Sequence, residues 1–248
     1  MNENLWKVEN FWASVHCTST VLDKIAVKRR ESKRVERHVL QKDEGLLSIT
    51  YSEKENIESF VNIMGMKHFR IMAETMMKDA YKYNFDDSSS VNRKNTIDEN
   101  SRLNALAHIS LLQHTFGVVN ELYKIITRRY GIYSDVFYLT AFAHDFGKSK
   151  ALKWDYQIDS SLEHHKASSE YVRRVALGAE NKVTITKHDD ELIKTICDVL
   201  NAHHTPEDEN MFHAVKSTDE NKTLHIEIIN KLKEADQNQR AIELEMLS

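Results

Sequence analysis

The sequence has very few of the residues that end or bend regular secondary structure. Its 248 residues include only one proline and six glycines, which is too few for the many tight turns of an all-β fold. Long alternating runs of β-branched residues, the usual sign of strands, are also absent. These absences exclude a β-sandwich or a β-barrel and predict an all-α fold.

Cysteine is scarce, and long apolar runs are missing. Cys17 and Cys197 are the two cysteines and form no CxxC pair, which fits a reducing cytoplasm and argues against a disulfide framework or a thiolate zinc site. No apolar run approaches the ~20 residues of a membrane-spanning helix. The first residues, MNENLWKVENFW, include acids and lack the apolar segment of a signal peptide. We therefore expect a cytoplasmic protein without a membrane partner.

A general excess of basic residues is absent as well. The net charge is −4, which does not describe a general nucleic-acid binder. Residues 24–38, KIAVKRRESKRVERH, are a local exception, with seven Lys or Arg against two Glu. Such a stretch either follows a phosphate backbone or forms a solvated helix face, so single-stranded nucleic acid is one candidate partner.

A polar segment divides the chain. Residues 84–95, NFDDSSSVNRKN, are rich in Ser and Asn and are typical of a loop. We therefore predict a helical N-terminal region at 1–96, rich in Met and aromatic residues, and a second domain at 97–248 with strong apolar periodicity. The oligomeric state is left open by the sequence.

Histidine and aspartate occur at unusual places in the second domain. His144 and Asp145 follow directly on the apolar run 136–143, in the segment TAFAHDFGKSK. His114 falls in the middle of the apolar face of a predicted helix, and Asp236 shares the inward face of the last predicted helix with Ile228, Ile229, Leu232, Ala235 and Ile242. Each of these ionisable residues is therefore expected to be buried.

Two further predicted helices show the same feature. Ser160 and Glu163 form a capping-box pattern that predicts a helix start, and His164 then falls on its buried side, while His165 is expected to face solvent. The helix ELIKTICDVLNAHH ends in the doublet His203–His204, one on each flank of its apolar stripe. One histidine on an apolar face is usually a satisfied core residue, but repeated occurrences on separate helices indicate a shared site.

Burying these groups together needs a compensating charge. Buried carboxylates without partners are costly, and neither Asp145 nor Asp236 has an obvious cationic partner on its own helix. A shared cation would satisfy them all, and imidazole and carboxylate ligands suit Mn, Fe, Ni or Zn. The mixture of N and O donors without thiolates favours an open catalytic site over a closed structural one.

The order of these residues resembles that of a known family, the HD superfamily of metal-dependent phosphohydrolases. The resemblance covers roughly residues 103–245, and HDFGK is its most specific part; HHKASSEYV and KEADQNQR are similar to the family's later ligand helices. Members of this family are all-α and hydrolyse phosphomonoesters, phosphodiesters or triphosphates. The fold implied is an HD-domain helical bundle with a helical N-terminal extension.

The resemblance also implies a metal site and a reaction. It implies one metal held by four side chains and a second metal held by further histidines, with Asp145 bridging; the full ligand set is His114, His144, Asp145, His164, His203, His204 and Asp236. Two divalent ions are expected, with Mn, Fe, Ni and Mg as candidates. Asp145 and Lys148 are the expected catalytic residues, Lys148 as a cation for the phosphate or as the partner of Asp145. The expected reaction is hydrolysis of a phosphoester, in a phosphorylated small molecule or nucleotide, by a metal-activated water.

Two alternatives remain beside this interpretation. HTFGVVNELYK and FYLTAFAHDFGKS are similar to segments of HD-type nucleases and conjugative relaxases, which implies a single-stranded DNA substrate. The residues after the His doublet lack the Gly-Tyr-Pro signature of cyclic dinucleotide hydrolases, which argues against that class of HD enzyme. The second alternative is a non-catalytic helical scaffold with a structural metal.

Overall fold

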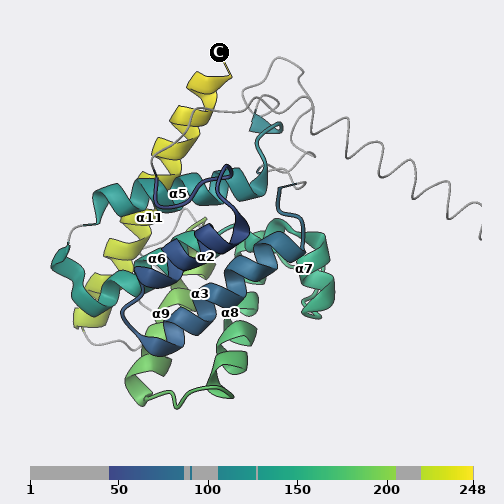
Figure 1. Cartoon of the computed structure of the whole chain (residues 1–248). Coiled ribbons are helices and arrows are strands. Elements are labelled where there is room, and N and C mark those ends of the chain that lie inside the picture. Colours follow the sequence, from purple (N-terminus) through teal and green to yellow (C-terminus); the bar gives the residue numbers. More distant parts are fainter. Residues whose placement is uncertain (1–44, 87–89, 91–105, 127, 205–218, 248) are drawn as a thin grey trace, which may run out of the picture. The chain divides into compact units, whose positions relative to one another are not determined.

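The computed structural model describes residues 45–247, apart from 87–89, 91–105, 127 and 205–218. These residues belong to one of the two compact units into which the chain divides, Lys42–Ser248. This part of the chain is helical and contains no strand, which confirms the all-α prediction (Figure 1). None of its helices is both long enough and apolar enough to cross a membrane. The basic stretch 24–38 lies outside the described residues.

The described part of the chain contains eight α-helices. Their bounds are α2 (Glu53–Asn62), α3 (Lys67–Lys82), α5 (Leu111–Ile125), α6 (Ser134–Ala143), α7 (Lys150–Asp155), α8 (His164–Glu180), α9 (Lys187–Ala202) and α11 (Asp219–Met246). Two 3-10 segments, η2 (Arg128–Tyr133) and η3 (Phe146–Lys148), flank α6.

Side-chain caps fix where several helices begin. The Ser110 hydroxyl accepts the Gln113 N–H at 3.1 Å at the start of α5, and Thr186 forms a capping box with Asp189 at the start of α9. The capping box predicted at Ser160 was wrong, because α8 begins only at His164. The reason is local: the Asp159 carboxylate accepts the N–H and the hydroxyl of Ser161, which holds these residues in a turn.

Helix α6 lies in the centre of the core. Every residue from 135 to 143 is buried, and the helix packs against α5, α9, α3, α11 and α8. A helix that is buried all round requires neighbours on every side, and this explains why its sequence is almost wholly apolar. The polar residues that follow it, His144 and Asp145, are consequently placed in the interior.

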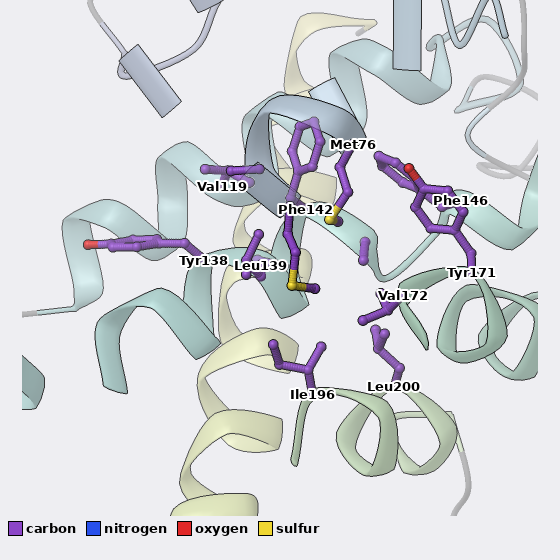
Figure 2. Close-up of a cluster of buried hydrophobic side chains, with 14 of the residues drawn as sticks. Met76, Val119, Tyr138, Leu139, Phe142, Phe146, Tyr171, Val172, Ile196 and Leu200 are labelled. Carbon is purple, nitrogen blue, oxygen red and sulfur yellow. The ribbon is translucent and has the colours of Figure 1, made fainter. Parts of the chain in front are cut away.

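Contacts between aromatic rings connect α6 to the neighbouring elements of the core. The Phe142 ring lies 4.6 Å from that of Phe60 and 5.1 Å from that of Phe146, and Phe146 continues to Tyr171 at 5.2 Å. Figure 2 shows Phe142, Phe146 and Tyr171 beside Met76 of α3. Burial of such side chains contributes roughly 1.5–3 kcal/mol each, so these contacts fix η3 firmly between α6 and α8.

Helices α2 and α3 share this core. Phe60, Met72 and Met76 are fully buried in the same apolar cluster as the residues of α5 to α11. The helices of residues 53–82, which the sequence assigned to the N-terminal region, therefore pack with the helices that carry the histidines. The predicted boundary itself, between residues 96 and 97, lies outside the described residues.

Candidate metal centre

The HDFGK segment leaves the end of α6 and is tied to α8. His144 and Asp145 are each 2% exposed. The Ser168 hydroxyl of α8 donates to the His144 carbonyl at 3.0 Å and accepts the Gly147 N–H at 2.9 Å. One serine therefore holds both ends of the segment in which the buried Asp145 lies.

Gly147 lets this segment approach α8 closely. A Cβ atom at position 147 would lie 2.0 Å from the carbonyl oxygen of His164, a backbone atom that cannot turn aside. Only a glycine fits this approach. The close packing brings the first residue of α8 beside the carboxylate: His164 Nε2 lies 3.6 Å from Asp145 Oδ1.

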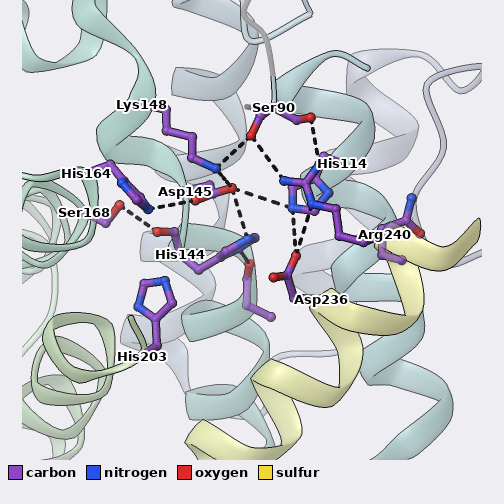
Figure 3. A network of polar contacts seen from close by, with 12 residues as sticks. Ser90, His114, His144, Asp145, Lys148, His164, Ser168, His203, Asp236 and Arg240 are labelled. Carbon is purple, nitrogen blue, oxygen red and sulfur yellow. Dashed lines mark hydrogen bonds and ion pairs between the residues drawn. The ribbon is translucent and has the colours of Figure 1, made fainter. Parts of the chain in front are cut away.

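His114, His144 and Asp145 form one group of donors. Each offers one atom, and these atoms lie within 4.8 Å of one another. Asp145 Oδ2 lies 3.6 Å from His114 Nε2 and 3.4 Å from His144 Nε2. From α11, Asp236 Oδ1 comes within 3.1 Å of His114 Nε2. Figure 3 shows these side chains converging from α5, the end of α6 and α11.

His164, His203 and His204 form a second group, also within 4.8 Å of one another. The ring of His204 lies 4.1 Å from that of His203 and 4.6 Å from that of His164. Since Asp145 points Oδ2 at the first group and Oδ1 at His164 of the second, its carboxylate lies between the two. This is the arrangement that a bridging carboxylate requires.

Unsatisfied polar atoms concentrate here. Among the described residues, the buried side-chain atoms without a hydrogen-bond partner include His114 Nε2, His144 Nε2, Asp145 Oδ1, His164 Nε2, His203 Nε2 and Asp236 Oδ1. Each such atom costs about 1–3 kcal/mol when nothing satisfies it, and folded proteins contain few of them. All six are N or O donors of the kind that borderline and hard divalent metals accept, so the residues fit one or two cations.

The protonation states also suit metal binding. Burial raises the pKa of Asp145, but Lys148 and His144 outweigh it and hold the pKa well below its ordinary value, so the carboxylate is ionised. Burial lowers the pKa of His164 to about 4 and, together with His204, that of His203 to about 3. These imidazoles are therefore neutral near pH 7, which is the form that binds a metal.

The position between His114 and Asp236 favours positive charge. Burial lowers the pKa of His114, but Asp236 and Glu243, on either side of the ring, outweigh burial and raise it. Burial raises the pKa of Asp236, whereas His114 and His144 lower it more strongly. A proton or a metal cation can supply that charge.

Lys148 contacts the central carboxylate. Its ammonium lies 2.5 Å from Asp145 Oδ2 and donates to the Ser90 carbonyl at 2.8 Å. Of the two roles expected for Lys148, this geometry shows the contact with Asp145.

Glu243 belongs to the site, and the sequence interpretation missed it. It is fully buried, and its Oε1 lies 2.8 Å from His114 Nδ1. Gln239 and Arg240 donate to its two oxygens at 3.0 and 2.9 Å. The signal was available, because Glu243 follows Asp236 by seven residues and so shares its face of the helix. Ile242, predicted to face inward, is instead 37% exposed.

The expectation for His165 was also wrong. His165 is 6% exposed rather than solvent-facing, and its ring lies 6.2 Å from that of His203 and 5.8 Å from that of His204. The cause is the later start of α8, which places both His164 and His165 in its first turn beside the end of α9. His164 is the more exposed of the two, with 30% of its side chain accessible.

Comparison with protein-family models, with curated proteins and with solved structures found no match for this chain. Membership of the HD superfamily therefore stays a prediction. The structure itself places all seven predicted ligands in the two neighbouring donor groups and at Asp236 beside His114.

Proposed function

We propose that this chain is a metal-dependent phosphoester hydrolase of the HD type. The observation that carries the proposal is the position of Asp145 between two groups of potential metal ligands, most of which present a buried atom without a hydrogen-bond partner. So many unsatisfied atoms are not expected in a core that binds no ligand, because each one lowers the stability of the fold.

In this proposal the ligands divide as the geometry divides them. One cation would be held by His114, His144, Asp145 and Asp236. A second would be held by Asp145 with the three histidines of the other group, His164, His203 and His204. Mn, Fe, Ni, Zn and Mg are the candidates. When bound, a pair of such cations lowers the pKa of a water molecule and neutralises the charge of a phosphoryl group.

The chain's own residues supply orientation and access. Lys148 holds Asp145 Oδ2 in place and keeps this carboxylate ionised. His114 and Asp145 are almost wholly buried, whereas the side chains of Asp236 and His164 are 35% and 30% exposed and His204 is exposed. The substrate phosphate therefore approaches from the side on which His164, His204 and Asp236 lie.

The substrate in this proposal is a phosphoester, in a phosphorylated small molecule, a nucleotide or a nucleic-acid strand, and the cytoplasm remains the expected location.

Turnover of generic esters tests the proposal. Purified protein loaded in turn with Mn²⁺, Fe²⁺, Ni²⁺, Zn²⁺ or Mg²⁺ is incubated with bis(p-nitrophenyl) phosphate and with p-nitrophenyl phosphate, and bound metal is counted. We expect hydrolysis with at least one metal and its loss in Asp145→Ala.

The matched control is Asp190→Ala, since Asp190 is exposed in the first turn of α9 and should leave turnover unchanged. Metal binding without hydrolysis of either ester under all five metals would support the scaffold alternative instead.

A further inference from the structure

Among the residues that the structure describes, one large aromatic side chain buries little of its surface in the fold. Trp154 is 87% exposed, more than any other large hydrophobic residue that the structure describes. It lines a pocket of about 830 Å³ together with Lys150, Lys153 and Ile158. Pockets of this size hold small-molecule groups, and an exposed indole gains nothing for folding that a polar residue would not.

The helix that carries Trp154 is held rigidly from its other side. Leu152 is fully buried. The Asp155 carboxylate accepts Lys82 Nζ at 2.8 Å and the Tyr83 hydroxyl, and Tyr156 donates to Asp79 at 2.5 Å. The exposed ring is therefore presented by a fixed platform rather than by a loose segment, which reduces the entropy lost on binding.

The pocket is lined by two lysines and two carboxylates. Asp155 is paired with Lys82, whereas Asp159 accepts hydrogen bonds from the neutral Ser161 and keeps its negative charge. Within the described part of the chain, no carboxylate lies within ion-pair distance of Lys150 or Lys153; the Lys153 ammonium donates to the Ser160 carbonyl at 3.1 Å. An aromatic face beside unpaired lysines suits a ligand that combines a flat ring with a phosphate.

The pocket adjoins the metal centre along the chain. It is formed by residues 150–160, which run directly from Lys148, at the central carboxylate, to the turn before His164. Lys150 is two residues from Lys148, so their Cα atoms are at most ~7 Å apart.

We propose that this pocket binds a base of a single-stranded nucleic acid, stacked on Trp154, with a backbone phosphate at Lys150 and Lys153. This proposal rests on the proposed function, because the bound strand would be the substrate that the metal centre hydrolyses. One open ring face contributes only ~1–3 kcal/mol per base, which by itself is weaker than millimolar affinity. A strand adds contacts on either side. A protein partner would need an apolar core around the tryptophan, whereas Ile158 beside it is buried and the other neighbours are polar.

Binding measured without metal tests the site independently of catalysis. The affinity of a fluorescein-labelled oligothymidylate is measured by anisotropy in EDTA. We expect Trp154→Ala to weaken binding by roughly 5- to 100-fold, Trp154→Phe by less, and the double variant Lys150→Ala/Lys153→Ala to weaken binding and flatten its salt dependence. Tyr123→Ala, which removes another exposed aromatic ring, on α5, should have no effect.

A direct contact gives a second readout. The chain has three tryptophans, so replacing Trp6 and Trp12 by Phe leaves Trp154 as the sole indole. Its fluorescence should be quenched by the oligonucleotide in proportion to binding.

Three outcomes would overturn the proposal: no binding by the wild type, equal binding by Trp154→Ala, or equally tight competition by thymidine monophosphate. Self-association lost in Trp154→Ala with unchanged oligonucleotide affinity would count against it as well. The proposed function fails separately, if no metal supports hydrolysis of the generic esters; those esters should be cleaved normally by Trp154→Ala.

Discussion

At the scale of single residues, the chain fixes which nitrogen is free in three of the ligand histidines. His144 and His203 each place Nδ1 2.7 Å from the carbonyl oxygen three residues earlier, on Ala141 and Leu200. His114 uses Nδ1 for Glu243. In all three rings Nε2 is the atom turned to the site, and an N–H on Nδ1 leaves Nε2 with the lone pair that binds a metal.

Glu243 should strengthen metal binding through His114. In Glu243→Gln the side chain keeps its size but loses its charge, so the His114 ring is less basic and less firmly oriented. We expect about 10- to 100-fold weaker metal affinity with little change in helix content, measured by calorimetric titration and far-UV circular dichroism. Glu234→Gln is the control, because it removes an exposed pair with Lys231 on the same helix; equal affinities in both variants would contradict the role of Glu243.

At the scale of helices, the distance between the two donor groups depends on how η3 packs on α8. The contact is made at Gly147 and Ser168. No bond within either segment sets this distance, so a small change in packing separates Asp145 from His164.

Gly147→Ala should therefore damage both stability and the second donor group. Its Cβ would lie 2.0 Å from the His164 carbonyl oxygen and 2.8 Å from Ala167 Cβ, and we expect a loss of about 2 kcal/mol or more in the free energy of unfolding, with fewer than two metals bound. Urea unfolding and metal counting check this.

Gly178→Ala is the matched control. It lies on α8 with nothing near its Cβ position, so it should be neutral or stabilise by up to ~1 kcal/mol. If Gly147→Ala had an unchanged free energy of unfolding and still bound two metals, the packing of η3 on α8 would be looser than described.

A carboxylate also joins three helices away from the metal centre. Asp79 of α3 accepts the hydroxyls of Tyr156, just after α7, and Tyr171 of α8, at 2.5 and 2.8 Å. Burial raises the pKa of Asp79, although both tyrosines oppose the shift. The folded state therefore holds this proton more tightly than the unfolded state does.

Asp79 should make stability fall as pH rises. Its stabilising contribution is present below the ordinary Asp pKa and is lost as pH increases through the raised, folded-state pKa. Asp79→Asn keeps the acceptor oxygen but cannot titrate, so the wild type should lose stability relative to this variant as the pH rises above 4. Urea unfolding of both proteins in EDTA measures the difference; a constant difference across that range would contradict the raised pKa.

At the scale of the whole molecule, the apolar core and the metal centre are separable. The core extends from α2 to α11, whereas most of the buried side-chain atoms without a partner in the described residues belong to the two donor groups beside the end of α6. The helices should therefore form without metal. The free-energy cost of the unsatisfied donor atoms would then be confined to that region.

Metal should raise the melting temperature without changing the helix content. A ligand that binds only the folded state at 100 times its Kd stabilises it by about 2.7 kcal/mol. Thermal unfolding followed by circular dichroism, with EDTA and with added Mn²⁺, measures the shift. The shift should shrink strongly in Asp145→Ala and persist in Asp190→Ala; unfolding by EDTA alone would show instead that the fold depends on metal.

The sequence by itself determined the all-α class, the apolar faces of α5, α9 and α11, and the set of histidines and aspartates that share those faces. These are properties of spacing along one helix, set by its 3.6-residue period. The tertiary structure decided what spacing cannot: that Asp145 lies between two donor groups, that Glu243 supports His114, and that His165 is buried. Each of these depends on the depth and angle at which one helix meets another, which are set by packing between residues far apart in the chain.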